Sequence, residues 1–143
     1  MADLIVLLVQ PDAAERARTL AALAQCCDPA GVHAAGSPEE AEAVLGLHAP
    51  PNGVRAPALV LLDLPPEQGV PLLGRIRSHP RTGGVPVVAI AAAADRRLQD
   101  AWYRGGANSV VGLARDEAEL LQKMRRLVSY WTTVNVTNRP SRV

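Results

Sequence analysis

The feature that most constrains the fold is an unbroken apolar run at residues 58–62, which ends on the carboxylate of Asp63. Prolines bound the run on both sides, so it is typical of a short strand covered on both faces, as in a parallel sheet. Asp63 then lies at the carboxyl end of the strand, the edge at which open α/β sheets bind ligands. An Asp after a strand can also simply cap the next turn, so its neighbours must decide its role.

Strand-like and helix-like segments alternate five times along the chain. The other runs with the length and composition of strands are residues 4–9, 32–35, 85–91 and 109–111. Helical apolar spacing follows each strand, and helix-capping residues open four of the helices: Asp12, Ser37, Asp95 and Asp116. We expect the remaining helix to begin after Gly69 and to be short.

This alternation predicts an α/β fold with parallel strands joined by right-handed crossovers. No Gly-x-Gly-x-x-Gly motif follows the first strand, which favours the flavodoxin-like doubly wound (βα)5 fold, with a five-stranded parallel sheet in the order 2-1-3-4-5. Strands one and three are neighbours in that order. We therefore expect one cleft, at which Asp63 meets residues from the ends of the other strands: Gln10, Pro11, Asp12, Ala91 and Gly112.

Composition excludes several classes of protein. The 143 residues suit one domain, and 15 basic against 14 acidic residues provide no basic field for a nucleic acid. The apolar runs are far shorter than the roughly 20 residues that span a membrane, and residues 1–3 lack the charged start of a signal peptide. We expect a cytoplasmic protein with neither a membrane nor a nucleic-acid partner.

Four segments carry a resemblance to a known family: LLVQPDAAERARTL, LVLLDLPPEQG, VPVVAIAAAAD and GANSVVGLARDEAELLQKMRRLVSYWTTVN. Their order and spacing resemble the CheY-like receiver domains of bacterial two-component response regulators. The last segment is similar to small stand-alone regulators paired with phytochrome-type histidine kinases. The resemblance spans residues 4–135 and implies a single-domain, non-enzymatic response regulator. It also implies Asp63 as phospho-acceptor and, as partner, a sensor histidine kinase, which is of phytochrome type in the similar subgroup.

The positions that match the rest of the family's active site are substituted. The acidic pair that holds Mg²⁺ falls on Gln10 and Pro11, the Ser or Thr of strand four on Ala91, and the lysine after strand five on Gly112. Asp12 stands one position late, where we expect a helix cap, with Mg²⁺ binding as its lesser alternative.

No other lysine is expected to compensate. Lys123 is the only lysine of the chain and lies in mid-helix, eleven residues beyond Gly112. If each lost electrostatic group is worth about 3 kcal/mol, two losses slow phosphoryl transfer roughly 10⁴-fold. We therefore interpret the chain as a degenerate receiver, or pseudo-receiver, that acts by protein–protein interaction and needs no cofactor.

Two alternatives remain open at the same cleft. In one, a histidine kinase still phosphorylates Asp63, with Arg115 supplying positive charge. The remote one is a flavodoxin-like small-molecule binder. A flavin phosphate would need backbone donors after the first strand, whereas the chain offers a proline and a carboxylate there.

The C-terminal segment predicts an assembly. We expect a receiver domain over residues 1–131 and a C-terminal arm and tail over 132–143, because residues 133–137 alternate as in a strand. Similar regulators of the phytochrome-linked subgroup form homodimers through the last helix and this arm. The resemblance therefore implies a dimer interface that includes Tyr130, Trp131 and Val134, and a disordered arm is the alternative.

Overall fold

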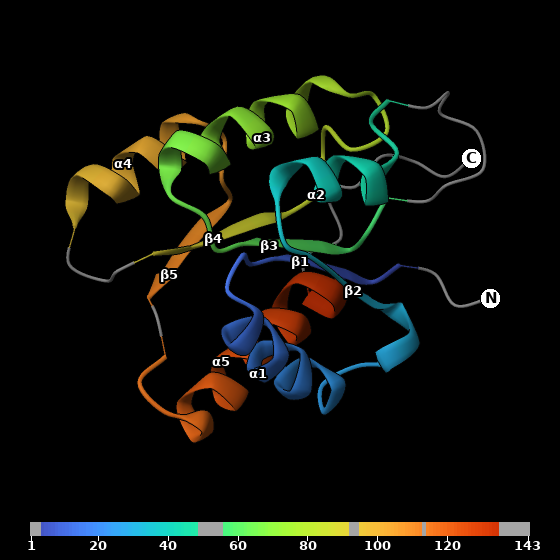
Figure 1. Ribbon diagram of the computed structural model, residues 1–143, viewed down its shortest axis with the longest axis vertical. Coiled ribbons are helices and arrows are strands. Elements are labelled where there is room, and N and C mark those ends of the chain that lie inside the picture. The colour runs from blue at the N-terminus through green and yellow to red at the C-terminus, as the bar shows by residue number, and fades with distance from the viewer. Residues whose placement is uncertain (1–3, 49–55, 92–94, 113, 135–143) are drawn as a thin grey trace.

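The computed structural model, shown in Figure 1, is a three-layer α/β arrangement and describes residues 4–48, 56–91, 95–112 and 114–134. Five strands within these ranges form one parallel sheet: β1 (Val6–Val9), β2 (Val32–Ala35), β3 (Leu59–Leu62), β4 (Val87–Ala91) and β5 (Ser109–Gly112). Their order is β2-β1-β3-β4-β5, which confirms the predicted topology.

Helices cover both faces of the sheet. They are α1 (Ala13–Ala24), α2 (Pro38–Leu45), α3 (Pro66–Ser78), α4 (Arg96–Arg104) and α5 (Glu117–Ser129). A 3₁₀ turn, η1 (Pro29–Gly31), precedes β2, and a π-helical turn, η2 (Tyr130–Val134), continues α5. In Figure 1, α1 and α5 lie on one face of the sheet, and α2, α3 and α4 lie on the other.

The predicted helix caps are confirmed. The carboxylate of Asp12 accepts a hydrogen bond from the Glu15 N–H at the start of α1, and Asp116 accepts one from Glu119 at the start of α5. Ser37 and Asp95 cap α2 and α4 in the same way. Each cap partners backbone donors that the first turn of a helix leaves unpaired, so these boundaries follow from local sequence.

The start of α3 differs from the prediction. We expected a helix after Gly69, but α3 begins at Pro66, with Pro65 at the N-cap. A proline at the first helical position loses no helical hydrogen bond, and its fixed φ suits the helix. Gly69 therefore lies inside α3, where a methyl group in place of its hydrogen would overlap Cη2 of Trp102 and lie 2.8 Å from Cζ2.

Two apolar clusters form the core, one on each face of the sheet. Trp102, which is fully buried, packs in the cluster beneath α2, α3 and α4. Trp131 packs in the cluster beneath α1 and α5. All residues of β1 and β3 are buried, which accounts for the continuous apolar runs in the sequence.

None of the helices in the described parts of the chain combines the length and the apolar composition that a membrane-spanning helix requires.

Candidate functional site

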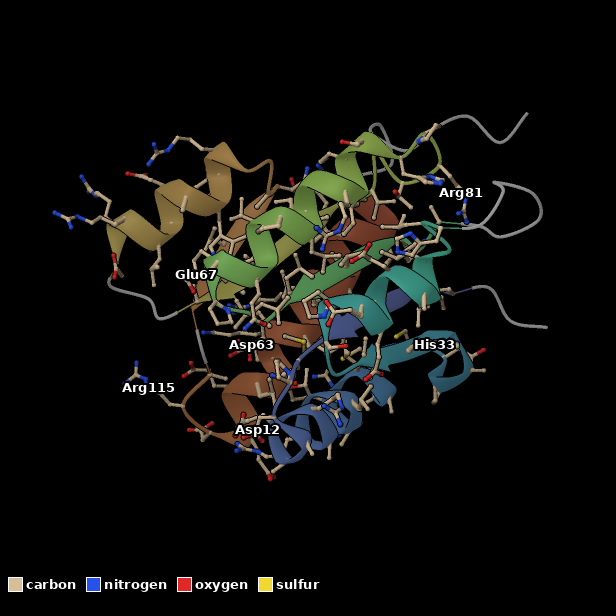
Figure 2. The ribbon with its side chains drawn as sticks, turned by 45° about the horizontal axis from the view of Figure 1, so that its top comes forward. Asp12, His33, Asp63, Glu67, Arg81 and Arg115 are labelled. Carbon is tan, nitrogen blue, oxygen red and sulfur yellow. The ribbon has the colours of Figure 1, made fainter. Side chains whose placement is uncertain are left out.

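Asp63 follows β3 directly and lies at the carboxyl edge of the sheet. Its backbone N–H donates to the carbonyl of Val9 in β1, which fixes the start of the loop. Figure 2 shows Asp12 and Glu67, from the starts of α1 and α3, at the same end of the molecule as Asp63, whereas His33 and Arg81 lie toward the other end. This arrangement confirms that the ends of β1 and β3 come together.

The Asp63 carboxylate is half-buried and accepts a hydrogen bond of 2.8 Å from Nε2 of Gln10. Burial is the main influence on the pKa of this carboxyl group and raises it above the ordinary value. The Gln10 hydrogen bond lowers this pKa, and the negative charges of Glu15 and Asp12 raise it again. The group hydrogen-bonded to the Asp63 carboxylate is therefore a neutral amide, and the nearby charges that influence the pKa of Asp63 are negative.

Gln10 is held in place from both sides. Its side chain is 4% exposed, and its backbone N–H donates to the Ala35 carbonyl in β2. Arg16, from the first turns of α1, donates Nη1 to the carbonyl oxygens of Gln10 at 2.8 Å and Pro11 at 3.1 Å. An arginine of the chain itself thus fixes the loop between β1 and α1.

Sequence reasoning brought Gln10 close to Asp63 but missed their hydrogen bond and the role of Arg16. The pairing of Val9 with Leu62 in the β1–β3 ladder makes Gln10 and Asp63 neighbours on adjacent strands. The predicted strand order therefore carried a signal for the hydrogen bond. The contacts of Arg16 depend on the path of the loop, for which the sequence has no local signal.

A shallow cleft of about 270 Å³ opens beside Asp63. Ala91 at the end of β4 and Trp102 of α4 contribute to its walls, together with apolar residues of the β3–α3 loop. The cleft therefore combines one half-buried carboxylate with a mostly apolar lining.

Solved structures provide the comparison with known proteins. The phosphorylated cyanobacterial phytochrome response regulator RcpA is 24% identical, with a TM-score of 0.78 over 94% of this chain and 98% of its own. The Mn²⁺-bound response regulator Rcp1 is 21% identical, with a TM-score of 0.72 over 96% and 99%. A response regulator receiver domain from Rhodospirillum rubrum is 22% identical, with a TM-score of 0.74 over 96% and 100%.

The chain has the receiver fold. No family model and no curated protein matches its sequence. At these identities the likeness establishes the fold, and the chemistry of the site depends on the residues that this chain places on it.

The loop after β1 departs from what a receiver uses to hold a metal. The Gln10 side chain is buried and hydrogen-bonded to Asp63, and the Pro11 side chain has no atom that could coordinate a metal ion. Asp12 caps α1, as predicted. Within the described ranges, no three His, Cys, Asp or Glu side chains are grouped so that they could hold a metal ion. The residues present therefore do not match an octahedral oxygen site for Mg²⁺.

The ends of β4 and β5 place Ala91 and Gly112 side by side in the ladder. Neither side chain can donate a hydrogen bond to a phosphoryl group. Lys123, however, reaches this edge from α5: its Nζ donates to the Gly112 carbonyl oxygen at 2.8 Å and lies 3.3 Å from Oε1 of Glu119. The separation of Lys123 from Gly112 in the sequence had led us to set Lys123 aside, but the fold brings its ammonium group to the backbone of Gly112, the residue on which the family's lysine falls in the sequence.

Arg115 does not take that place in this structure. Its side chain is 92% exposed, and its Nε lies 3.8 Å from Oε2 of Glu119. Figure 2 shows it projecting away from Asp63. Of the two cations considered from the sequence, the less expected one, Lys123, lies nearer to the strand ends.

The C-terminal segment requires a correction. Thr133 and Val134 belong to the π-helical turn η2, so they are not part of an extended strand, and residues 135–143 lie outside the described residues. Trp131 is only 8% exposed because it packs in the core of its own chain. Tyr130 is 50% exposed and contacts the Trp131 ring edge-on, with centroids 4.8 Å apart. Trp131 therefore has little surface to offer a second copy.

Proposed function

We propose that this chain is a receiver domain of a two-component response regulator that acts by binding proteins, with Asp63 left unphosphorylated. The observation that carries the proposal is the hydrogen bond from Gln10 to the Asp63 carboxylate. Through this bond the carboxylate of the phospho-acceptor position contacts a neutral amide, where receivers use a metal ion. On this proposal the domain has no enzymatic activity of its own.

The electrostatics of the site support this proposal. Phosphoryl transfer to a carboxylate depends on cations that neutralise the phosphoryl oxygens in the transition state. Here Asp12 and Glu15 add negative charge near Asp63. Loss of both the metal and the lysine after β5, at about 3 kcal/mol each, slows the transfer roughly 10⁴-fold.

The test is to incubate the protein with acetyl phosphate and Mg²⁺ and to measure its intact mass after acid quenching. We expect no adduct. A stoichiometric phosphoryl adduct that is absent from Asp63→Ala would refute the proposal. As a positive control, a receiver that is known to accept a phosphoryl group should be modified under the same conditions.

One observation favours a second candidate function, in which a histidine kinase phosphorylates Asp63. Lys123 brings an ammonium group to Gly112 at the carboxyl edge of the sheet. In this candidate, Lys123 would supply the positive charge that we first assigned to Arg115. The acetyl phosphate experiment decides between the two functions, and an adduct that Lys123→Met abolishes would establish the second.

The proposed partner is a sensor histidine kinase of phytochrome type, and the likeness to a phytochrome response regulator supports it. Binding that depends on shape should survive loss of the carboxylate. We therefore expect Asp63→Ala to bind such a kinase within about twofold of the parent affinity, as measured by calorimetry, since that residue then carries no regulatory phosphoryl group.

We also propose a homodimer through the C-terminal end of the chain, with residues 132–143 as its arm. The exposed ring of Tyr130 supports a contact there. Because Trp131 is buried in the core of its own chain, its part in this interface is limited to packing against the Tyr130 ring.

A further inference from the structure

The side-chain amide of Gln10 has one hydrogen-bonded atom, Nε2, and one buried atom without a described partner, Oε1. Its Nε2 donates to Asp63, while its Oε1 is buried and has no hydrogen-bond partner among the residues that the structure describes. Buried carbonyl oxygens are nearly always hydrogen-bonded, either to the protein or to ordered water. What stabilises this oxygen also determines whether the amide keeps its nitrogen on Asp63.

A cavity of about 40 Å³ lies beside Gln10, between α1, α5 and the ends of β4 and β5. Two cationic side chains line it, Arg18 and Lys123, together with Glu15 and Gly112. Arg18 is 44% exposed and forms an ion pair of 3.0 Å with Glu15. Lys123 is 30% exposed, and its ammonium group donates to the carbonyl oxygen of Gly112, another residue of the cavity lining.

We propose that Lys123 is a positioning residue of the Asp63 site, which acts through Gln10. Lys123 lines the same cavity as Gln10, and its positive charge favours the amide orientation that directs Oε1 away from Asp63 and Nε2 onto it. The proposal rests on Asp63 as the functional site of the chain. It gives Lys123, the single lysine of the sequence, a role at the site although Gly112 stands where the family has its lysine.

The physical reason is the dipole of the amide. In the observed orientation Nε2 faces the Asp63 carboxylate, and Gln10 shares its cavity with the cations Lys123 and Arg18 and with the Glu15 carboxylate, which pairs with Arg18. In the flipped orientation the carbonyl oxygen would face the Asp63 carboxylate, and the NH₂ group would take the place of the oxygen beside the cavity. Both changes are unfavourable, and removal of a cation weakens the preference for the observed orientation.

The experiment follows the side-chain amide of Gln10 by ¹⁵N NMR, with its signals assigned by their loss in Gln10→Glu. In Lys123→Met we expect the amide protons to exchange with solvent about tenfold faster, the factor that corresponds to roughly 1.4 kcal/mol. Lys123→Arg keeps the charge and should keep the protection. Circular dichroism verifies that each variant is folded.

One control separates this role from general effects of charge. Arg126→Met removes the same charge from an exposed position of α5 and should leave Gln10 exchange within about twofold of the parent. Equal acceleration in Lys123→Met and Arg126→Met overturns the proposal, as does a Lys123→Arg variant that behaves like Lys123→Met. The readout involves neither phosphoryl transfer nor partner binding, so it can fail independently of the proposed function.

Discussion

The contact between Gly69 and Trp102 predicts opposite effects of the same substitution at two positions of α3. Gly69→Ala would place a methyl group over the Trp102 ring, which is fully buried and therefore cannot swing into solvent. Gly74→Ala, in the same helix, would place its methyl group in open space, with no atom of the described residues within 4 Å other than those of its chain neighbours and of the surrounding helix backbone. The second variant is thus a matched control for the first.

The magnitudes follow from two terms. Replacing Gly by Ala inside a helix stabilises it by about 1 kcal/mol, and this gain is common to both variants. Overpacking a filled core costs about 1–3 kcal/mol, and this cost applies at Gly69 alone. We expect Gly74→Ala to be about 1 kcal/mol more stable than the parent, and Gly69→Ala to be about 1–3 kcal/mol less stable than Gly74→Ala.

Urea unfolding, followed by circular dichroism, measures both free energies of unfolding. The difference between the variants should shrink in a Trp102→Leu background, because the smaller side chain leaves room for the methyl group. If Gly69→Ala is as stable as Gly74→Ala in the parent background, the packing of α3 against Trp102 is not as described here.

Three further predictions concern the site and the C-terminus. The folded chain raises the pKa of Asp63 above its ordinary value of 3.8, so the folded state binds this proton more tightly than the unfolded state, and ionisation costs stability above the raised pKa. Asp63→Asn should therefore increase the free energy of unfolding at neutral pH, with the gain lost as pH falls below 3.8; destabilisation at neutral pH would contradict this. Arg16→Met should lower stability by about 1–2 kcal/mol through its lost backbone contacts, whereas Arg18→Met, which breaks an exposed ion pair, should change it by less than about 1 kcal/mol in urea titrations. If the arm makes the dimer, light scattering should show a dimer for the full chain and a monomer for a chain that ends at Trp131, and the same oligomeric state for both would exclude that role.

Local sequence signals predicted the parts of the fold that depend on neighbouring residues. The caps at Asp12, Ser37, Asp95 and Asp116 and the apolar strands were all recognisable, because hydrogen bonds to the next three residues and burial on both faces leave direct patterns. The start of α3 was missed because two consecutive prolines read as a loop, although the second one suits the first helical position.

The candidate site was predictable only as far as strand order defines it. The neighbourhood of Gln10 and Asp63 follows from adjacent parallel strands. The reach of Lys123 to Gly112 depends on how α5 packs beside β5, which spacing along the chain does not encode. For the same reason, the apolar stripe of α5 does not distinguish between a Trp131 that packs in the core of its own chain and one that packs against a second copy.

The two tryptophans lie in different halves of the core, Trp102 beneath α2, α3 and α4, and Trp131 beneath α1 and α5. Each face of the sheet therefore has its own fluorescent reporter, and no other tryptophan in the sequence adds to the signal. Chains that keep only one of them, with phenylalanine at the other position, would report the melting of each layer separately. Coincident transitions would mean that the central sheet joins the two layers into a single cooperative unit.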